Sequence, residues 1–101
     1  MDFHINQTPD KAIIVFDVNK IMGTEAAGVH ESILDLIDNG CKLIAIDLCK
    51  VTFITSYGLG ILMYAYTICT KRDVGFYITG LNERLQEIIQ KVNFHKIIDI
   101  K

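Results

Sequence analysis

Five short apolar runs, separated by polar or turn-forming residues, predict the strands of this chain. The first two, at 3–6 and 12–16, flank a Thr-Pro-Asp-Lys turn and are typical of a β-hairpin. The run over 42–48 is continuously apolar at its centre, as expected of a strand that is covered on at least one face. Two further strands are predicted over 75–79 and 96–100.

Apolar residues at helical spacing predict three helices among these strands. The first is expected over about 24–39, with Thr24 as its N-cap. The second is expected over about 56–72, and the third begins at Asn82. The resulting order of elements predicts an α/β fold with a mixed sheet, because parallel neighbouring strands need crossover connections.

The length and composition favour a single folded domain over residues 1–101. Half of the 101 residues are hydrophobic, which is enough for a two-layer core. Ten basic and twelve acidic residues leave a net charge of −2. No nucleic-acid partner is expected, because the chain has no block of Lys and Arg that could neutralise a run of phosphates.

The sequence also favours a cytoplasmic protein without a membrane association. The N-terminus lacks the pattern of a signal peptide, and the most apolar run, 58–69, is too short to cross a bilayer. The cysteines are odd in number and widely spaced, which indicates neither a disulfide framework nor a zinc site. We therefore interpret Cys41, Cys49 and Cys69 as small core residues in a reducing compartment.

The segment around Ser56 carries the main candidate chemistry. A strand leads through Thr55 and Ser56 directly into the second helix, which predicts Ser56 at the helix N-terminus and, on local sequence, as its N-cap. Unpaired N–H groups and the helix dipole make such a position favourable for a phosphate. We attribute Gly58 and Gly60 to close packing of the helix, because neither a dinucleotide-binding glycine pattern nor a P-loop lysine accompanies them.

The second helix is apolar nearly all round, which indicates a role in contacts. One face, expected to be Leu59, Leu62, Met63 and Tyr66, would pack on the sheet. The other, expected to be Ile61, Tyr64, Ala65 and Ile68, would meet a partner or a neighbouring helix. The loop before the first helix is expected to extend this second surface, because loops at one end of a parallel sheet gather together. The candidate partner-binding residues are Ile21, Met22, Tyr57, Gly58, Ile61 and Tyr64.

No enzymatic activity, catalytic residue, metal site or cofactor is predicted. A serine hydrolase would need a base beside Ser56, yet the surrounding sequence lacks the G-x-S-x-G elbow and places no histidine there. Asp47, near the end of a strand, is interpreted as a turn or cap residue. The histidines, one in each of three elements, are expected at the surface or at an edge: His4, His30 and His95.

Two segments resemble the STAS domain, the fold of bacterial anti-sigma-factor antagonists and of the cytoplasmic tails of sulfate transporters. Residues 46–54, followed by Ser56 and by Gly-Leu-Gly over 58–60, are similar to the family's strand, linker, phospho-acceptor turn and following helix. Residues 80–94 resemble the family's third helix and the turn before it. The resemblance covers essentially the whole chain. It implies a mixed, mostly parallel sheet of about five strands with helices packed mainly on one side.

This resemblance implies an anti-sigma factor antagonist. Such a domain binds a partner that is both an anti-sigma factor and a serine kinase, and phosphorylation at Ser56, or at Thr55 as the secondary candidate, would switch it off. In the family an aspartate stands where this chain has Thr55, so the alternative is a non-phosphorylated scaffold or ligand-sensing module in a signalling complex. A sulfate-transporter tail is disfavoured by the lack of a membrane span. A monomer or a weak dimer is expected.

Overall fold

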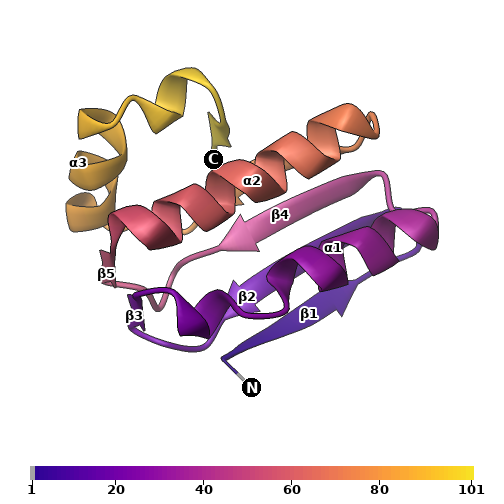
Figure 1. The fold of residues 1–101 in the computed structure, drawn as a ribbon, viewed down its shortest axis with the longest axis horizontal. Coiled ribbons are helices and arrows are strands. Elements are labelled where there is room, and N and C mark those ends of the chain that lie inside the picture. The colour runs from indigo at the N-terminus through magenta and orange to yellow at the C-terminus, as the bar shows by residue number, and fades with distance from the viewer. Residues whose placement is uncertain (1) are drawn as a thin grey trace.

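The computed structural model describes residues 2–101, which contain a five-stranded mixed sheet (Figure 1). Across the sheet the order is β1 (Phe3–Gln7), β2 (Lys11–Phe16), β4 (Leu43–Asp47), β6 (Gly75–Thr79) and β7 (Asp99–Ile100). The hairpin of β1 and β2 is antiparallel, and the remaining neighbours are parallel. The predicted α/β fold with a mixed, mostly parallel sheet is confirmed.

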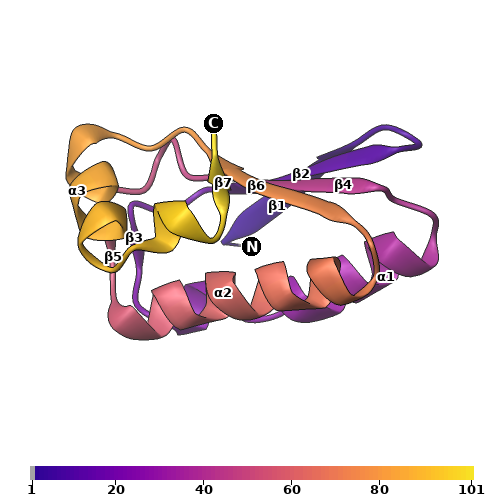
Figure 2. The same ribbon diagram turned by 90° about the horizontal axis from the view of Figure 1, so that it is seen from above.

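Two helices, α1 (Val29–Asp38) and α2 (Ser56–Lys71), cover one face of this sheet, as Figure 2 shows. The third helix, α3 (Glu83–Lys91), lies beyond the end of the sheet at which β4 ends (Figure 1). This arrangement agrees with the expectation that the helices pack mainly on one side. It also leaves the carboxyl ends of the parallel strands close to the N-termini of α2 and α3.

The hydrophobic core lies between the sheet and the pair α1 and α2. Successive side chains of a strand face opposite sides, so alternate residues of the central strands point toward these helices. Ile14, Ile44 and Ile78 come from three neighbouring strands and are fully buried there. No charged or polar residue is buried among residues 2–101, so the apolar side chains alone make up this core.

The face that α2 turns toward the core differs from the predicted one. Ala65 is fully buried, although it was assigned to the outer face, and Met63 and Tyr66 are only partly buried. The prediction was wrong because nearly every position of α2 is apolar, so the pattern could not identify the stripe nearest the sheet. The buried residues of α2 are Gly58, Leu59, Leu62, Ala65 and Cys69.

Two element boundaries differ from those predicted. Thr24 begins a separate 3-10 turn, η1 (Thr24–Ala26), and α1 starts only at Val29. Gly28 interrupts the helical pattern because its φ of 87° is left-handed. At the C-terminus, a second 3-10 turn, η2 (Phe94–Lys96), shortens the predicted last strand to two residues.

A small second sheet escaped prediction. It pairs β3 (Lys20–Ile21) with β5 (Phe53–Ile54) in parallel. Two residues are too few to show an alternation of apolar and polar positions, so the pattern gave no strand signal here. This pairing joins the loop before α1 to the start of α2.

Two of the three cysteines occupy the core as predicted. Cys41 and Cys69 are buried, and burial raises the pKa of the Cys69 thiol to about 12. The prediction was wrong for Cys49, which is exposed in the turn after β4. There its N–H donates to Oδ1 of Asp47 at 2.9 Å, which confirms Asp47 as a turn residue. The Asp47 carboxylate also raises the pKa of the Cys49 thiol, because it disfavours the thiolate.

Candidate functional site

A short segment, residues 20–24, called the strap below, holds the start of α2 in place. Its first two residues, Lys20 and Ile21, pair with β5, and the Thr55 N–H donates to the Ile21 carbonyl at 3.0 Å. The Thr55 hydroxyl in turn donates to the Met22 carbonyl at 3.2 Å. The strap and the first turn of α2 are therefore joined through backbone and side chain at the same place.

Thr55, and not Ser56, is the N-cap of α2. Thr55 has an extended backbone, and its Oγ1 accepts a hydrogen bond from the Gly58 N–H at 3.1 Å. The prediction of Ser56 as N-cap was wrong, because two adjacent hydroxyl residues have similar capping preference and local sequence cannot separate them. Aspartate caps helices as well as threonine does, so Thr55 can carry out structurally what the family's aspartate would do at this position.

Ser56 is the first residue of α2 and its side chain is exposed. Within residues 2–101 its hydroxyl makes no hydrogen bond, in contrast to the neighbouring Thr55 hydroxyl, which donates one and accepts one. The N–H groups of Ser56 and Tyr57 precede the first intrahelical bond, which the Leu59 N–H donates to the Thr55 carbonyl at 2.9 Å. Ser56 thus presents a free oxygen at the positive end of the helix dipole.

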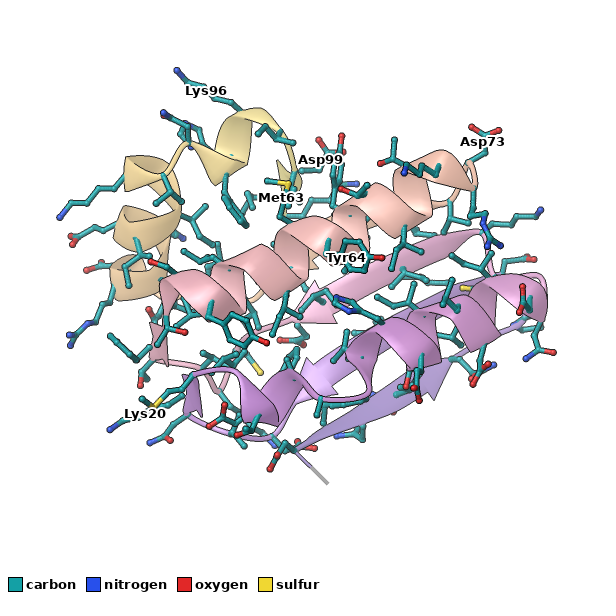
Figure 3. All side chains as sticks on the ribbon, viewed as in Figure 1. Lys20, Met63, Tyr64, Asp73, Lys96 and Asp99 are labelled. Atoms are coloured by element: carbon teal, nitrogen blue, oxygen red, sulfur yellow. The ribbon has the colours of Figure 1, made fainter. Side chains whose placement is uncertain are left out.

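Large exposed apolar side chains occupy the strap and the outer side of α2, beginning at the residue after Ser56. Tyr57 is 70% exposed, and Met22 on the strap and Tyr64 on α2 are each 56% exposed. Tyr57, Ile61 and Tyr64 follow one another at helical spacing and share one side of α2. Figure 3 shows Tyr64 on the side of α2 that faces away from the sheet. Met22, Tyr57 and Tyr64, together with the half-buried Ile61, are called the exposed patch below.

Gly23 on the strap fixes the position of Tyr57. A Cβ atom at Gly23 would lie 2.7 Å from Cδ2 of Tyr57, so the ring rests directly against the strap backbone. The φ of Gly23 is also left-handed at 149°, which a residue with a side chain adopts only under strain. The sequence pattern does not predict this role of Gly23, because neither the turn nor the ring contact has a local signature.

Glu25 holds the strap through hydrogen bonds to its backbone. Its Oε1 accepts hydrogen bonds from the N–H groups of Met22 at 2.8 Å and Gly23 at 3.0 Å. These bonds lower the pKa of Glu25, because they stabilise the carboxylate. Glu25 is therefore a positioning residue for Met22, one that sequence analysis did not identify.

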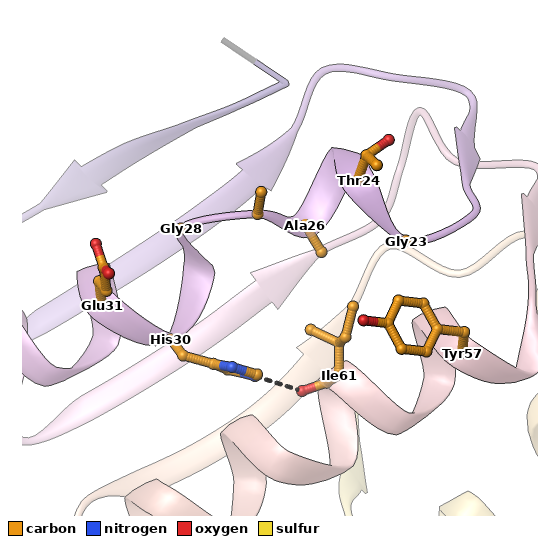
Figure 4. A pocket seen from close by; sticks show the side chains of 9 residues that line it. Gly23, Thr24, Ala26, Gly28, His30, Glu31, Tyr57 and Ile61 are labelled. Atoms are coloured by element: carbon orange, nitrogen blue, oxygen red, sulfur yellow. Dashed lines mark hydrogen bonds between the residues drawn. The ribbon is translucent and has the colours of Figure 1, made fainter.

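His30 connects α1 with α2 beside the exposed patch. Its Nε2 lies 3.1 Å from the Ile61 carbonyl oxygen and donates to it (Figure 4). Its ring also meets Tyr64 edge-on, with centroids 4.6 Å apart. His30 is half-buried and lines an open hollow, which is consistent with the expected surface or edge position. The expectation also holds for His95, which is exposed, and for His4, on the edge strand β1. There the His4 and Lys50 side chains lower the pKa of Asp17.

A hollow of about 440 Å³ opens between the strap, α1 and α2 (Figure 4). Tyr57 and Ile61 form one wall, and His30 and Glu31 another. The lining mixes apolar and polar groups, a combination typical of places where a ligand or a partner side chain is received. Among residues 2–101, no group of three or more His, Cys, Asp or Glu side chains is arranged to hold a metal ion.

Two of the predicted partner-binding residues are buried. Ile21 is only 1% exposed, and Gly58 lies against it and Ile54. A Cβ atom at Gly58 would come within 2.8 Å of Ile54 Cγ1 and 3.0 Å of the Ile21 carbonyl oxygen, so close packing explains this glycine as predicted. The same explanation was wrong for Gly60, whose Cβ position is open. Ile21 and Gly58 therefore pack beneath the site and are not accessible to a partner.

Within residues 2–101 no helix is both long enough and apolar enough to cross a bilayer.

Comparisons with known proteins agree with this geometry. A family model for the STAS domain matches residues 4–101. Curated protein sequences give no significant match. An anti-sigma-factor antagonist (STAS) domain protein from Planctomyces limnophilus has a similar structure, with a TM-score of 0.82 at 16% identity, over 99% of this chain and 88% of that one.

Two further proteins of known structure are similar. The anti-sigma factor antagonist SpoIIAA matches in its unphosphorylated form with a TM-score of 0.80 at 12% identity, over 98% of this chain and 87% of that one. The phosphorylated form of SpoIIAA, from Bacillus, matches with a TM-score of 0.74 at 10% identity, over 98% and 90%. A sulfate transporter family protein from Wolinella succinogenes gives 0.68 at 20% identity, over 83% and 69%.

At such low sequence identities the structural similarities establish only the fold. The family is assigned from the match between the family model and the sequence. The match covers nearly the whole chain, and the helices, the Ser56 turn and all of the sheet except Phe3 lie within it. The chain belongs to the STAS domain family.

Proposed function

We propose that this single domain, residues 1–101, is an anti-sigma factor antagonist that acts in the cytoplasm by partner switching. It binds a regulatory protein that is both an anti-sigma factor and a serine kinase, and phosphorylation at Ser56 ends this binding. One observation carries the proposal. The exposed, unbonded Ser56 hydroxyl stands at the start of α2, directly beside an exposed apolar patch.

The domain supplies the phosphate acceptor and a binding surface, and the partner kinase supplies the ATP and the catalytic groups. The Ser56 oxygen attacks the γ-phosphorus of ATP held by the kinase, the bond to the ADP leaving group breaks, and the serine proton passes to a base of the kinase. Such a transfer depends mainly on positioning, so the domain needs no catalytic group of its own. The first N–H groups of α2 and the helix dipole then stabilise the phosphate.

Phosphorylation changes the patch by charge. The phosphate adds roughly −1.5 to −2 charges, which the helix N-terminus tolerates but which an apolar interface cannot bury without a large desolvation cost. Tyr57 follows Ser56 directly, so any partner that covers the Tyr57 ring approaches the phosphate closely. The modification therefore acts locally and requires no change of the fold.

Ser56 is a better acceptor than Thr55. The Thr55 hydroxyl already donates to the Met22 carbonyl and accepts from the Gly58 N–H. Phosphorylation of Thr55 would remove the proton that it donates and disturb the helix cap. The Ser56 hydroxyl makes neither of these hydrogen bonds, so its phosphorylation leaves the start of α2 intact.

Parallel affinity capture tests this proposal. Wild-type protein, Ser56→Glu and the matched control Ser56→Ala are immobilised, incubated with lysate of the native host, and their bound proteins are quantified by mass spectrometry. We expect wild type and Ser56→Ala to retain a kinase-like ATPase that Ser56→Glu loses. Equal retention by all three, or retention of no such ATPase, would contradict the phosphorylation switch.

A second candidate function is a non-phosphorylated scaffold or ligand-sensing module in a signalling complex. The hollow of about 440 Å³ beside Tyr57 supports it, because a small ligand seated there would contact the exposed patch directly. Retention of the same partner by all three variants would favour this candidate. In either role we expect a monomer or a weak dimer.

A further inference from the structure

A second hollow, of about 320 Å³, lies between the strap, β5 and the start of α3. It is lined by Lys20 and Met22 of the strap, Thr52 and Phe53 at β5, and Arg84 of α3. Two of these five side chains are cations, and no carboxylate lines the hollow in the described chain, residues 2–101. The hollow is thus a basic site at the same end of the molecule as Ser56.

The two cations lack internal partners. Within residues 2–101 the ion pairs are His4 and Lys50 with Asp17, and Arg72 with Asp38. None of them includes Lys20 or Arg84, both of which are exposed. Figure 3 shows the Lys20 side chain pointing away from the body of the molecule.

Arg84 lies in the first turn of α3, where the helix dipole disfavours a positive charge. It is the second residue of α3, within the first turn after the cap Asn82. A cation there opposes the helix dipole, at a typical cost of about 0.3–1 kcal/mol. Glu83 precedes Arg84 in the same turn, but the arginine makes no ion pair within residues 2–101, which makes it a candidate for binding.

We propose that Lys20 and Arg84 bind an acidic segment of the partner protein, adjacent to the exposed patch. The partner would place one or two carboxylates between the cations and an apolar side chain on Met22 and Phe53. This inference rests on the proposed function in that it takes a protein as the occupant. It adds the chemistry of that partner: an acidic surface next to an apolar one.

Charge and shape favour a protein over other anions. Two cations are too few to follow a nucleic-acid backbone, whose binding depends on many phosphate contacts. The nearby N-terminus of α3 is already capped, because Asn82 Oδ1 accepts from the Leu85 N–H at 2.9 Å. Met22 is 56% exposed and Phe53 is half-buried, so the hollow offers an apolar floor that a free phosphate would not use.

Charged surfaces of this kind contribute chiefly to the rate of association. Complementary charges steer two proteins toward each other, and rim charges affect association more than dissociation. Basic residues beside Ser56 would also lose part of their attraction for an acidic partner once a phosphate lies close by. The hollow and the phosphorylation site would thus act on the same partner.

A titration with defined probes tests the inference without a purified partner. Two-dimensional NMR spectra of the full chain are followed as a blocked hexapeptide of glutamate and leucine is added. The comparison probes are the same peptide with lysine for glutamate, inorganic phosphate, and a short single-stranded DNA. We expect saturable shifts at Lys20, Met22, Thr52, Phe53 and Arg84 with the acidic peptide only, reduced by added salt.

Charge reversal supplies the matched variants. Lys20→Glu with Arg84→Glu should weaken peptide binding about tenfold or more. The control, Lys42→Glu with Lys96→Glu, makes the same change of charge at exposed residues outside the hollow and should leave binding within about twofold. Thermal unfolding of both double variants establishes that they are folded.

Three results would overturn the inference: no saturable shift around the hollow, an equal response to phosphate or DNA, or equal weakening by both double variants. These results leave the phosphorylation switch untouched. Conversely, acidic-peptide binding at the hollow together with unchanged capture by Ser56→Glu would overturn the switch and keep the basic site. The experiments therefore distinguish a failure of the basic site from a failure of the phosphorylation switch.

Discussion

The helices α2 and α3 begin in the same way and yet expose different surfaces. Each follows an extended cap residue whose side chain accepts a hydrogen bond from an N–H three residues later: Thr55 from Gly58, and Asn82 from Leu85. The outward side of α3 is polar, as for an ordinary amphipathic helix. The outward side of α2 carries Tyr57 and Tyr64.

This contrast distinguishes the helix features that stability requires from those that it does not require. A cap, an apolar inner stripe and a polar outer side are sufficient for a stable helix, and α3 has all three. The aromatic rings of Tyr57 and Tyr64 leave more than half of their surface exposed, so they add less to stability than core side chains do. Their place beside Ser56 is therefore best explained by contact with another molecule.

The largest effect is expected at Gly58, where α2 approaches the strap most closely. Gly58→Ala should destabilise the domain by about 3 kcal/mol, because the added methyl group meets Ile54 and the Ile21 backbone. Gly60→Ala is the matched control: its Cβ position is open, so it should stabilise the helix by up to about 1 kcal/mol. Denaturant unfolding measures both. Equal effects would contradict the close contact of α2 with the strap.

The next largest effect concerns the partner. Tyr57→Ala should weaken binding of the captured partner by about 2 kcal/mol, or about 30-fold, as for a central aromatic contact. Its stability should change by less than about 0.5 kcal/mol, since the side chain is 70% exposed. Val92→Ala, at an exposed apolar residue after α3, should change neither quantity. Calorimetric titration and thermal unfolding check these values, and equal binding by all proteins would contradict the assignment of the patch.

The two caps should have smaller and similar effects on stability. Thr55→Ala and Asn82→Ala each lose a helix cap, which costs about 1 kcal/mol. Asn82→Ala should cost somewhat more, because its Nδ2 also donates to the Val51 carbonyl at 3.1 Å. Thr55→Asp should remain within about 0.5 kcal/mol of wild type in denaturant unfolding, since aspartate is an equally good cap. A loss as large as that of Thr55→Ala would contradict the capping role.

The smallest effect is the pH dependence of the strap. The pKa of Glu25 is lowered in the folded state, so its stabilising contribution is present above the ordinary value of 4.5 and is lost as the pH falls through the lower, folded value. We expect the amide resonances of Met22 and Gly23 to shift as the pH is lowered below 4.5. Glu25→Gln should show the shifted positions already at neutral pH. Unchanged resonances would show that Glu25 does not hold the strap.

Most of the fold was predictable because its long elements have strong local signals. The hairpin, β6 and the start of α3 at Asn82 follow directly from alternation, apolar runs and a good cap residue. The late start of α1 depends on the left-handed backbone of Gly28, and glycine within a helical pattern leaves that open. The pairing of β3 with β5 involves only two residues from each strand.

The site was predictable only in part. The positions of Ser56, Met22, Tyr57 and Tyr64 on one exposed region follow from the topology. The capping role of Thr55 does not, because it depends on which of two adjacent hydroxyl groups meets the Gly58 N–H in space. Local patterns also carry no sign of the Glu25 bonds or of the hollow lined by Lys20 and Arg84, because these bring together side chains whose geometry only the folded chain sets.

In the proposed function Ser56 carries a regulatory phosphate. Site-resolved mass spectrometry of the wild-type protein and of Ser56→Ala, each incubated with the captured kinase and ATP, tests this. We expect one phosphate, on Ser56, in the wild type and none in Ser56→Ala. A phosphate on Thr55, or a wild-type protein that stays unmodified while bound to an active kinase, would contradict the proposed role of Ser56.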